Sequence, residues 1–258
     1  MAGPHVHVPF ERVPGFLPFI KERRLDLEIY FGTRVFDSIG PVEIERLAKD
    51  LDYNPSISVH APFMDLSPGA VDTEVRAVTI RKLKRTLELA GPLQPKAVVF
   101  HSGYEKWRFG LRPDIWLEGS LITWDAVVSA ASGMDAKIAI ENIFEDDPHN
   151  LKLLMKELGS ERFGLCFDAG HFNLFSKTPL SDWLGELLPY IKELHLHDNL
   201  RDNDTHLPIG EGTFDFDALF KAVSGLSPRP LYTIEAHSPE DVLKGMGRFN
   251  EYRQRYLL

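Results

Sequence analysis

Hydrophobic residues recur along this chain in short runs that alternate with longer amphipathic segments. Each run is rich in Val, Ile, Leu or Phe, which is the composition expected of strands buried on both faces of a parallel sheet. We predict eight strands: His5–Phe10, Leu25–Phe31, Ile57–Phe63, Ala97–Ser102, Lys137–Ile143, Phe163–Asp168, Glu193–Asp198 and Leu231–Ala236.

The segments between these runs have the period of amphipathic helices. The clearest is Val71–Ala90, and we expect its buried face to include Val75, Val78, Leu83 and Leu87. Five further segments have the same pattern: Asp114–Ser132, Pro148–Leu158, Ser181–Ile191, Asp215–Ser224 and Pro239–Arg253.

The alternation of about eight strands with about eight helices indicates an α/β protein, a closed (β/α)8 TIM barrel. The 258 residues fit one barrel, so we expect a single domain over residues 1–258. The competing architecture is an open doubly wound sheet, which would be expected to carry a glycine-rich phosphate turn after an early strand. The first predicted strand, His5–Phe10, is not followed by one, so the open sheet ranks second.

Charge and composition narrow the function classes. The net charge of -9 and the pI of about 5.6 weigh against a nucleic-acid partner, which usually requires a basic face. A local basic patch is still compatible with this total. Cys166 is the only cysteine, so no intramolecular disulfide can form. No apolar run approaches the roughly 20 residues that span a bilayer, and Met1–Phe10 lacks a signal-peptide pattern. We therefore expect a cytoplasmic protein with no membrane partner.

Residues able to bind a metal ion follow almost every predicted strand from the third onward. In a barrel these strand ends converge on one rim, where active sites form. Charged and imidazole groups there must be paired or bound to an ion, and this mixture of donors suits Zn, Mn, Fe or Co. Each residue alone is explained more simply by packing or ion pairing, but the set is not. The candidate metal ligands are His60, His101, Glu141, Asp168, His171, His195, Asp204, His206 and Glu235.

The remaining histidines and the cysteine have simpler interpretations. We expect His5 and His7 to pack as ordinary residues of the first strand, and Cys166 to be a small apolar strand residue. His149 and His237 receive no assignment.

At these residues the chain resembles the xylose isomerase-like barrel superfamily. That group includes sugar isomerases, ketose 3-epimerases, inosose dehydratases and the endonuclease IV family of abasic-site nucleases. The resemblance covers nearly the whole chain. It depends most on five segments: Ser58–Pro62, Ile140–Asn142, Phe167–His171, His195–Asn199 and His206–Gly212.

The resemblance implies two patterns of metal binding. In the epimerase-like members two Glu, one Asp and one His hold a single ion, and a second His lies beside the substrate. The matching ligands here are Glu141, Asp168, His195 and Glu235, and the matching second histidine is His171. In the endonuclease IV family nine ligands hold three zinc ions, and all nine candidates named above match them in type. The resemblance therefore implies one to three divalent ions and leaves both branches open.

The first mechanism is isomerisation or epimerisation of a small sugar, sugar phosphate or polyol. The carbonyl and the neighbouring hydroxyl of the substrate would bind the metal ion, which would stabilise an enediolate as a Lewis acid. Glu141 and Glu235 would face each other across the substrate, one removing a proton from carbon and the other returning it. Arg201 is a candidate to hold a substrate hydroxyl or phosphate. The alternative is that Arg201 is only a solvent-exposed loop residue without a role in binding. We place this mechanism slightly ahead.

The second mechanism is phosphodiester hydrolysis at a multinuclear centre, which the nine ligands favour. The acidic charge and the scarcity of basic, aromatic loops argue against duplex DNA as its substrate. Lys106–Arg112 is the exception, and its Trp107 is a candidate to stack on a substrate; alternatively Trp107 and Phe109 cap the barrel mouth. A non-catalytic metal-binding barrel is the third class. The sequence leaves the substrate, the native metal and homo-oligomer formation open.

Overall fold

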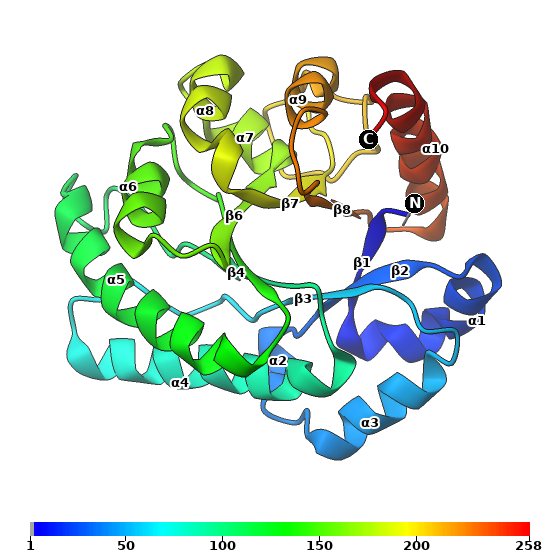
Figure 1. Cartoon of the computed structure of the whole chain (residues 1–258), viewed down its shortest axis with the longest axis horizontal. Coiled ribbons are helices and arrows are strands. Elements are labelled where there is room, and N and C mark those ends of the chain that lie inside the picture. The colour runs from blue at the N-terminus through cyan, green and yellow to red at the C-terminus, as the bar shows by residue number, and fades with distance from the viewer. Residues whose placement is uncertain (1–2) are drawn as a thin grey trace.

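A computed structural model describes residues 3–258, in which eight parallel strands close into a barrel (Figure 1). β1 pairs with both β2 and β8, so the sheet has no free edge. The predicted (β/α)8 barrel is confirmed, and the open doubly wound sheet is excluded. The strands are β1 (His5–Pro9), β2 (Asp26–Tyr30), β3 (Ile57–His60), β4 (Ala97–His101), β5 (Lys137–Glu141), β6 (Phe163–Asp168), β7 (Ile191–Leu196) and β8 (Leu231–Ile234).

The helices lie around the outside of the barrel (Figure 1). None of them, within residues 3–258, is long and apolar enough to cross a membrane. The α-helices are α1 (Val13–Arg23), α2 (Thr33–Phe36), α3 (Pro41–Asp50), α4 (Thr73–Ala90), α5 (Pro113–Ala130), α6 (His149–Leu158), α7 (Ala169–Phe175), α8 (Leu180–Leu187), α9 (Phe216–Val223) and α10 (Pro239–Tyr256).

Four helices, α1, α2, α3 and α7, were not predicted from the sequence pattern. α1 contains Pro14, Gly15 and Pro18, which are typical of loops. α7 follows β6 with no connecting residue, because the carboxylate of Asp168 caps its first turn by accepting the N–H of His171 (2.6 Å). The sequence pattern therefore did not predict α1, whose prolines and glycine are typical of loops, or α7, which follows a strand without a loop.

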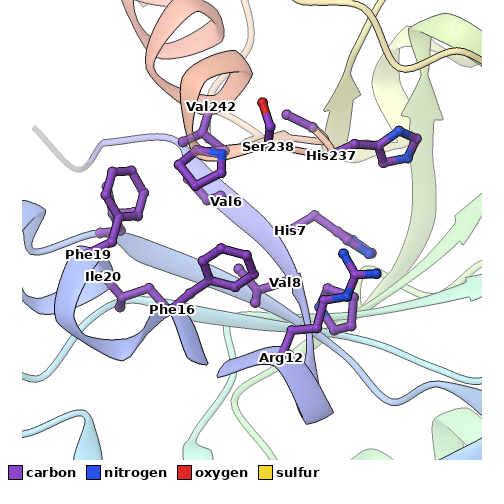
Figure 2. Close-up of a pocket in the computed structure, with 14 residues that line it drawn as sticks. Val6, His7, Val8, Arg12, Phe16, Phe19, Ile20, His237, Ser238 and Val242 are labelled. Atoms are coloured by element: carbon purple, nitrogen blue, oxygen red, sulfur yellow. The ribbon is translucent and has the colours of Figure 1, made fainter. Parts of the chain in front are cut away.

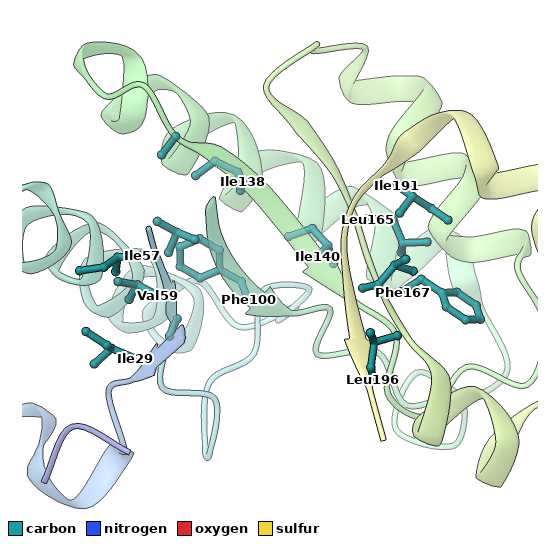
Figure 3. Packing of buried hydrophobic residues seen from close by; sticks show 14 of the residues in the cluster. Ile29, Ile57, Val59, Phe100, Ile138, Ile140, Leu165, Phe167, Ile191 and Leu196 are labelled. Atoms are coloured by element: carbon teal, nitrogen blue, oxygen red, sulfur yellow. The ribbon is translucent and has the colours of Figure 1, made fainter. Parts of the chain in front are cut away.

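The main hydrophobic core lies between the barrel and the helices. Strand residues such as Val59, Phe100, Ile140 and Leu165 belong to one buried cluster with helix residues including Trp124. Figure 3 shows part of this packing, with labelled residues from β2 to β7. The apolar strand residues thus stabilise the barrel from its outer face, through contacts with the helix layer.

The buried face of α4 differs from the one predicted. Leu83 and Leu87 are buried as expected, but Val75 and Val78 are each 41% exposed. Thr79 and Thr86 are buried instead, and their hydroxyls donate to the carbonyls four residues earlier in the helix. These internal hydrogen bonds satisfy the hydroxyls, so threonine can occupy the core-facing stripe.

The interior of the barrel is mostly polar. Its apolar part is a small separate cluster of Val99, Ala139 and Cys166, as expected for the cysteine. On the other side, the buried carboxylate of Glu193 accepts hydrogen bonds from the hydroxyls of Ser58 (3.1 Å) and Thr233 (2.6 Å). TIM-barrel interiors are usually filled by branched apolar side chains, so this polar layer is a departure that calls for a functional explanation.

The position of the core on α4 gives a test of stability. Leu83→Ala should destabilise the protein by about 2–5 kcal/mol, because it leaves a cavity in a closely packed core. Val78→Ala, on the same helix but partly exposed, should cost less than about 1 kcal/mol. Urea unfolding of both variants measures the difference, and equal losses would contradict the assignment of the buried face.

Candidate metal centre at the carboxyl ends of the strands

The nine candidate ligands converge in one network at the carboxyl end of the barrel, and we call this group the cup. Its members come from β3 to β7, from helix α7, from the loop after β7 and from the residue that follows β8. The cup consists of His60, His101, Glu141, Asp168, His171, His195, Asp204, His206 and Glu235.

His195 lies at the centre of the cup and is fully buried. Its Nδ1 atom is 3.2 Å from a carboxylate oxygen of Glu235 and 3.6 Å from oxygens of both Glu141 and Asp168. Three carboxylates at the carboxyl ends of β5, β6 and β8 therefore surround one imidazole nitrogen. This is the geometry of a site that can enclose a cation.

Two further histidines approach Glu141 from β3 and β4. The Nε2 atoms of His60 and His101 lie 2.9 Å and 3.3 Å from the same oxygen of Glu141. Phe63 stacks on the ring of His101, with centroids 4.0 Å apart and 5° between the planes. This triad can hold a cation of its own, because its donor atoms lie within 4.8 Å of one another.

The opposite side of the cup is built by helix α7 and by the loop after β7. His171 Nδ1 lies 3.1 Å from Glu141, and its Nε2 lies 3.4 Å from Asp204. Asp204 also contacts His206 (3.2 Å), whose other nitrogen is 3.4 Å from Glu235. These contacts link the loop residues to the strand residues in one set.

The fold of the loop after β7 depends on Asp198 and Gly212. Asp198 and Leu207 exchange two backbone hydrogen bonds, and the Asp198 carboxylate accepts the N–H of Gly212 (2.9 Å). A Cβ atom at position 212 would lie only 2.3 Å from the Asn199 carbonyl oxygen, so glycine is required there. The loop is thereby folded back, which brings Asp204 and His206 over the barrel mouth.

Sequence reasoning missed His7, Glu28 and His197. His7 was expected to pack as an ordinary strand residue, but its Nδ1 contacts Glu28 (2.9 Å) and Glu235 (3.2 Å). Burial would lower the pKa of His7, yet these carboxylates raise it to about 10. The signal was available, since the alternation of β1 places His5 and His7 on the interior face with the other polar groups.

His197 is the second overlooked histidine of the cup region. Its Nε2 lies 3.1 Å from Asp168, and its ring stacks on His206 with centroids 3.9 Å apart. His237, which received no assignment, also stacks on His206, with centroids 4.7 Å apart. A Cβ on Gly170 would lie 2.0 Å from the His197 ring, so the small residue makes room for it. The spacing of two from His195 could have revealed His197, because both residues share one strand face.

Charge balance in the cup requires cations. Burial would raise the pKa values of Glu141 and Glu235, but the neighbouring histidines outweigh it and hold both well below the ordinary value. Burial would lower the pKa values of His171 and His195, but the surrounding carboxylates raise both well above theirs. Ionised carboxylates are thus neutralised by protons on imidazoles, a role that a divalent cation can take over by displacing those protons.

The donor set fits a divalent metal ion. The Nδ1 atoms of His195 and His197 are buried and have no hydrogen-bond partner among the described residues. Several groups of three His, Asp or Glu donors, including Asp168, His171 and His197, lie within ligand distance of one another. Unpartnered buried nitrogens beside ionised carboxylates are the arrangement that a borderline metal such as Zn prefers.

The two candidate substrate-binding residues lie outside the cup. Arg201 donates from Nε to the side-chain oxygen of Asn173 (3.1 Å), so its guanidinium is held against the loop. Trp107 is 70% exposed on the β4–α5 loop, with Lys106 over its ring, whereas Phe109 is buried against Tyr104. The structure therefore leaves Trp107 free to contact a large ligand and holds Arg201 against Asn173.

A largely apolar cavity lies between β1, α1 and the start of α10 (Figure 2). Phe16, Phe19 and Val242 line its apolar part, and His7 and Arg12 lie at its polar end. Figure 2 shows Arg12 extending toward His7. Arg12 and His7 therefore form the polar end of this cavity.

The comparisons with known proteins agree with this architecture. Residues 27–252 match the family model described as xylose isomerase-like TIM barrel, so the chain belongs to that family. A D-tagatose 3-epimerase-like protein shares 26% identity, covers 98% of both chains and has a TM-score of 0.84. The TTHB071 protein from Thermus thermophilus, solved after soaking with ZnCl2, shares 28% identity over 96% of this chain and 97% of its own, with a TM-score of 0.78.

Endonuclease IV from Thermus thermophilus has the same fold. Its TM-score is 0.68 at 18% identity, and the match covers 97% of this chain and 98% of its own. The two branches of the expected resemblance, epimerase-like and endonuclease IV-like barrels, are both found among the structural neighbours.

Next to the cup, Glu145 is a buried acid with a separate role. Its carboxyl group accepts hydrogen bonds from the Ser102 hydroxyl and from the N–H of Ile143 (2.6 Å). Ser102 in turn accepts the N–H of Tyr104, so this acid joins the loops after β4 and β5. Burial raises the pKa of Glu145 to about 7.

This shift predicts a pH-dependent stability. The unfolded chain loses the Glu145 proton near the ordinary pKa of 4.5, but the folded protein keeps it until about pH 7. Stability is therefore lost as the pH rises through this window. Glu145→Gln mimics the neutral acid and does not titrate. As the pH rises from 4 to 8, the free energy of unfolding of wild type should therefore fall relative to that of the variant by up to about 3 kcal/mol. Urea unfolding across this range tests it, and a pH-independent difference would contradict it.

Proposed function

We propose that this protein is a divalent-metal-dependent isomerase or epimerase that acts on a small sugar, sugar phosphate or polyol. The observation that carries the proposal is the convergence of Glu141, Asp168 and Glu235 on Nδ1 of His195. The similarity to a D-tagatose 3-epimerase-like protein over nearly the whole chain supports the same class. A cytoplasmic location remains a prediction from the sequence.

Glu141, Asp168, His195 and Glu235 would hold the metal ion, with Zn, Mn, Fe and Co as the candidates. When bound, the ion supplies Lewis-acid stabilisation of negative charge on substrate oxygens. Further donors of the cup would allow one or two additional ions: His60 and His101 form a triad with Glu141, which the two sites would then share.

Glu141 and Glu235 would serve as the acid–base pair. They lie at the carboxyl ends of β5 and β8. Neighbouring histidines hold both pKa values well below the ordinary value, so both carboxylates are ionised at neutral pH. Either one could accept a proton from a carbon atom placed between them. The counterpart would return a proton to the opposite face only after taking one up from solvent, while the first carboxylate would release its proton to solvent. His171 lies 3.1 Å from Glu141, so it would orient that carboxylate and contact the substrate.

Phosphoester hydrolysis is the second candidate, because the cup contains more donors than one ion uses. The pair Asp204 and His206 and the triad around His60 add ligands away from His195. A multinuclear centre can activate water with one ion and stabilise the leaving oxygen with another. The net charge of -9 argues against a duplex DNA substrate but not against a small phosphoester.

Metal stoichiometry distinguishes the two candidates. Protein purified without chelators should contain one ion per chain if isomerisation is correct, and two or three if hydrolysis is correct. Plasma emission spectrometry measures the metal content.

Two activity assays match the two candidates. Isomerisation or epimerisation is detected by incorporation of solvent deuterium into ketohexoses, and phosphoester hydrolysis is detected with bis(p-nitrophenyl) phosphate. Metal-free protein that gains no activity in either assay when Mn, Co or Zn is added would contradict the proposal.

Glu235→Gln should lower turnover by at least about 10³-fold, because it removes a carboxylate that both candidates need. The exposed Glu211→Gln, on the loop after β7, is the matched control and should keep wild-type activity. Full activity in Glu235→Gln, measured in whichever assay the wild type supports, would refute the role of Glu235.

His60→Ala tests the number of ions directly. In a multinuclear centre this variant should lose about one ion per chain, since His60 and His101 share one oxygen of Glu141. In a mononuclear centre held around His195, the metal content should stay at the wild-type value. An unchanged content of two or three ions would count against the triad as a separate site.

A further inference from the structure

Glu28, on β2, lies directly beneath the cup and belongs to neither ligand pattern discussed above. Its carboxylate is fully buried and lies between two histidines. One oxygen is 3.2 Å from Nε2 of His195, and the other is 2.9 Å from Nδ1 of His7. Since β2 contributes no member of the cup, this contact connects the metal centre to a strand outside it.

The contact decides which nitrogen of His195 is available for an ion. An ionised carboxylate can only accept hydrogen bonds, so Nε2 of His195 must carry the hydrogen. The other nitrogen, Nδ1, has no hydrogen-bond partner among the described residues and faces Glu141, Asp168 and Glu235. A histidine ligand binds a metal ion through its unprotonated nitrogen, and a partner on the second nitrogen fixes both tautomer and ring orientation.

No other group among residues 3–258 forms a hydrogen bond with Nε2 of His195. Glu193 is close, with a carboxylate oxygen within 4.8 Å of the nearest ligand atoms of Glu28 and His195. Its Oε1 accepts from Ser58 and Thr233, and its Oε2 has no hydrogen-bond partner among the described residues. The orientation of the His195 ring therefore depends on Glu28 rather than on a redundant set of partners.

We propose that Glu28 is a positioning residue that holds His195 with Nδ1 toward the metal ion and Nε2 protonated. This inference rests on the metal centre of the proposed function and holds for either reaction. Glu28 touches neither the substrate nor the ion; it acts through His195, and its contact with His7 keeps its own carboxylate in place.

Zinc affinity of the metal-free protein tests the role of Glu28. The probe is Zn2+ alone, measured by competition with a chromophoric chelator. Glu28→Gln keeps the volume but can accept from only one histidine, so Zn2+ should bind about 10–100-fold more weakly than to wild type. Glu145→Gln is the matched control, a buried isosteric change near the cup that should leave the affinity within about twofold of wild type. An affinity of Glu28→Gln equal to that of wild type would overturn the proposal.

Nitrogen-15 NMR of the histidine rings in the wild-type protein gives a second test, in which a variant serves only to assign the His195 signals. With Zn2+ bound, His195 should show a protonated Nε2 and a metal-bound Nδ1, with its signals assigned by their loss in His195→Gln. Zn2+ bound through Nε2 would overturn the inference. Wild-type protein that binds no Zn2+, Mn2+ or Co2+ would instead refute the proposed metal centre, and with it the inference.

Discussion

Burial of like charges at one end of a barrel is the constraint on which the rest of this structure depends. Five carboxylates of the interior are at most 6% exposed: Glu28, Glu141, Asp168, Glu193 and Glu235. Isolated ionised carboxylates in such surroundings are very costly, so each must be paired with a cation or hold a proton. The histidines provide that pairing for Glu28, Glu141, Asp168 and Glu235. Burial raises the pKa of Glu193 to about 8, so that acid keeps a proton at neutral pH.

The polar groups occupy the barrel interior, and most of the apolar packing lies outside the barrel instead. Val99, Ala139 and Cys166 are a small apolar cluster inside the barrel, whereas the main core lies between the strands and the helix layer. Ser58, Thr233 and Glu193 form a hydrogen-bonded layer beneath the cup. A polar interior contributes less to stability than an apolar one, but it holds the metal ligands by directional contacts.

The sequence pattern was sufficient for the architecture and for the nine residues of the cup, because strand periodicity and position at a strand end are local properties. It failed where tertiary contacts decide the outcome. Thr79 and Thr86 replace Val75 and Val78 in the core because their hydroxyls bond to the helix backbone. His7 was misinterpreted because its significance depends on Glu28 and Glu235, which are far away in the sequence. The position of Arg201 depends on Asn173, a contact that no spacing rule reveals.

The central claim is that the cup holds a divalent ion, and anomalous diffraction tests it most directly. Crystals grown with Zn2+ and measured on both sides of the zinc absorption edge would locate each ion without reference to activity. We expect the strongest anomalous peak between Glu141, Asp168, Glu235 and Nδ1 of His195. Peaks confined to the outer surface, with the cup free of anomalous density at saturating Zn2+, would contradict this account.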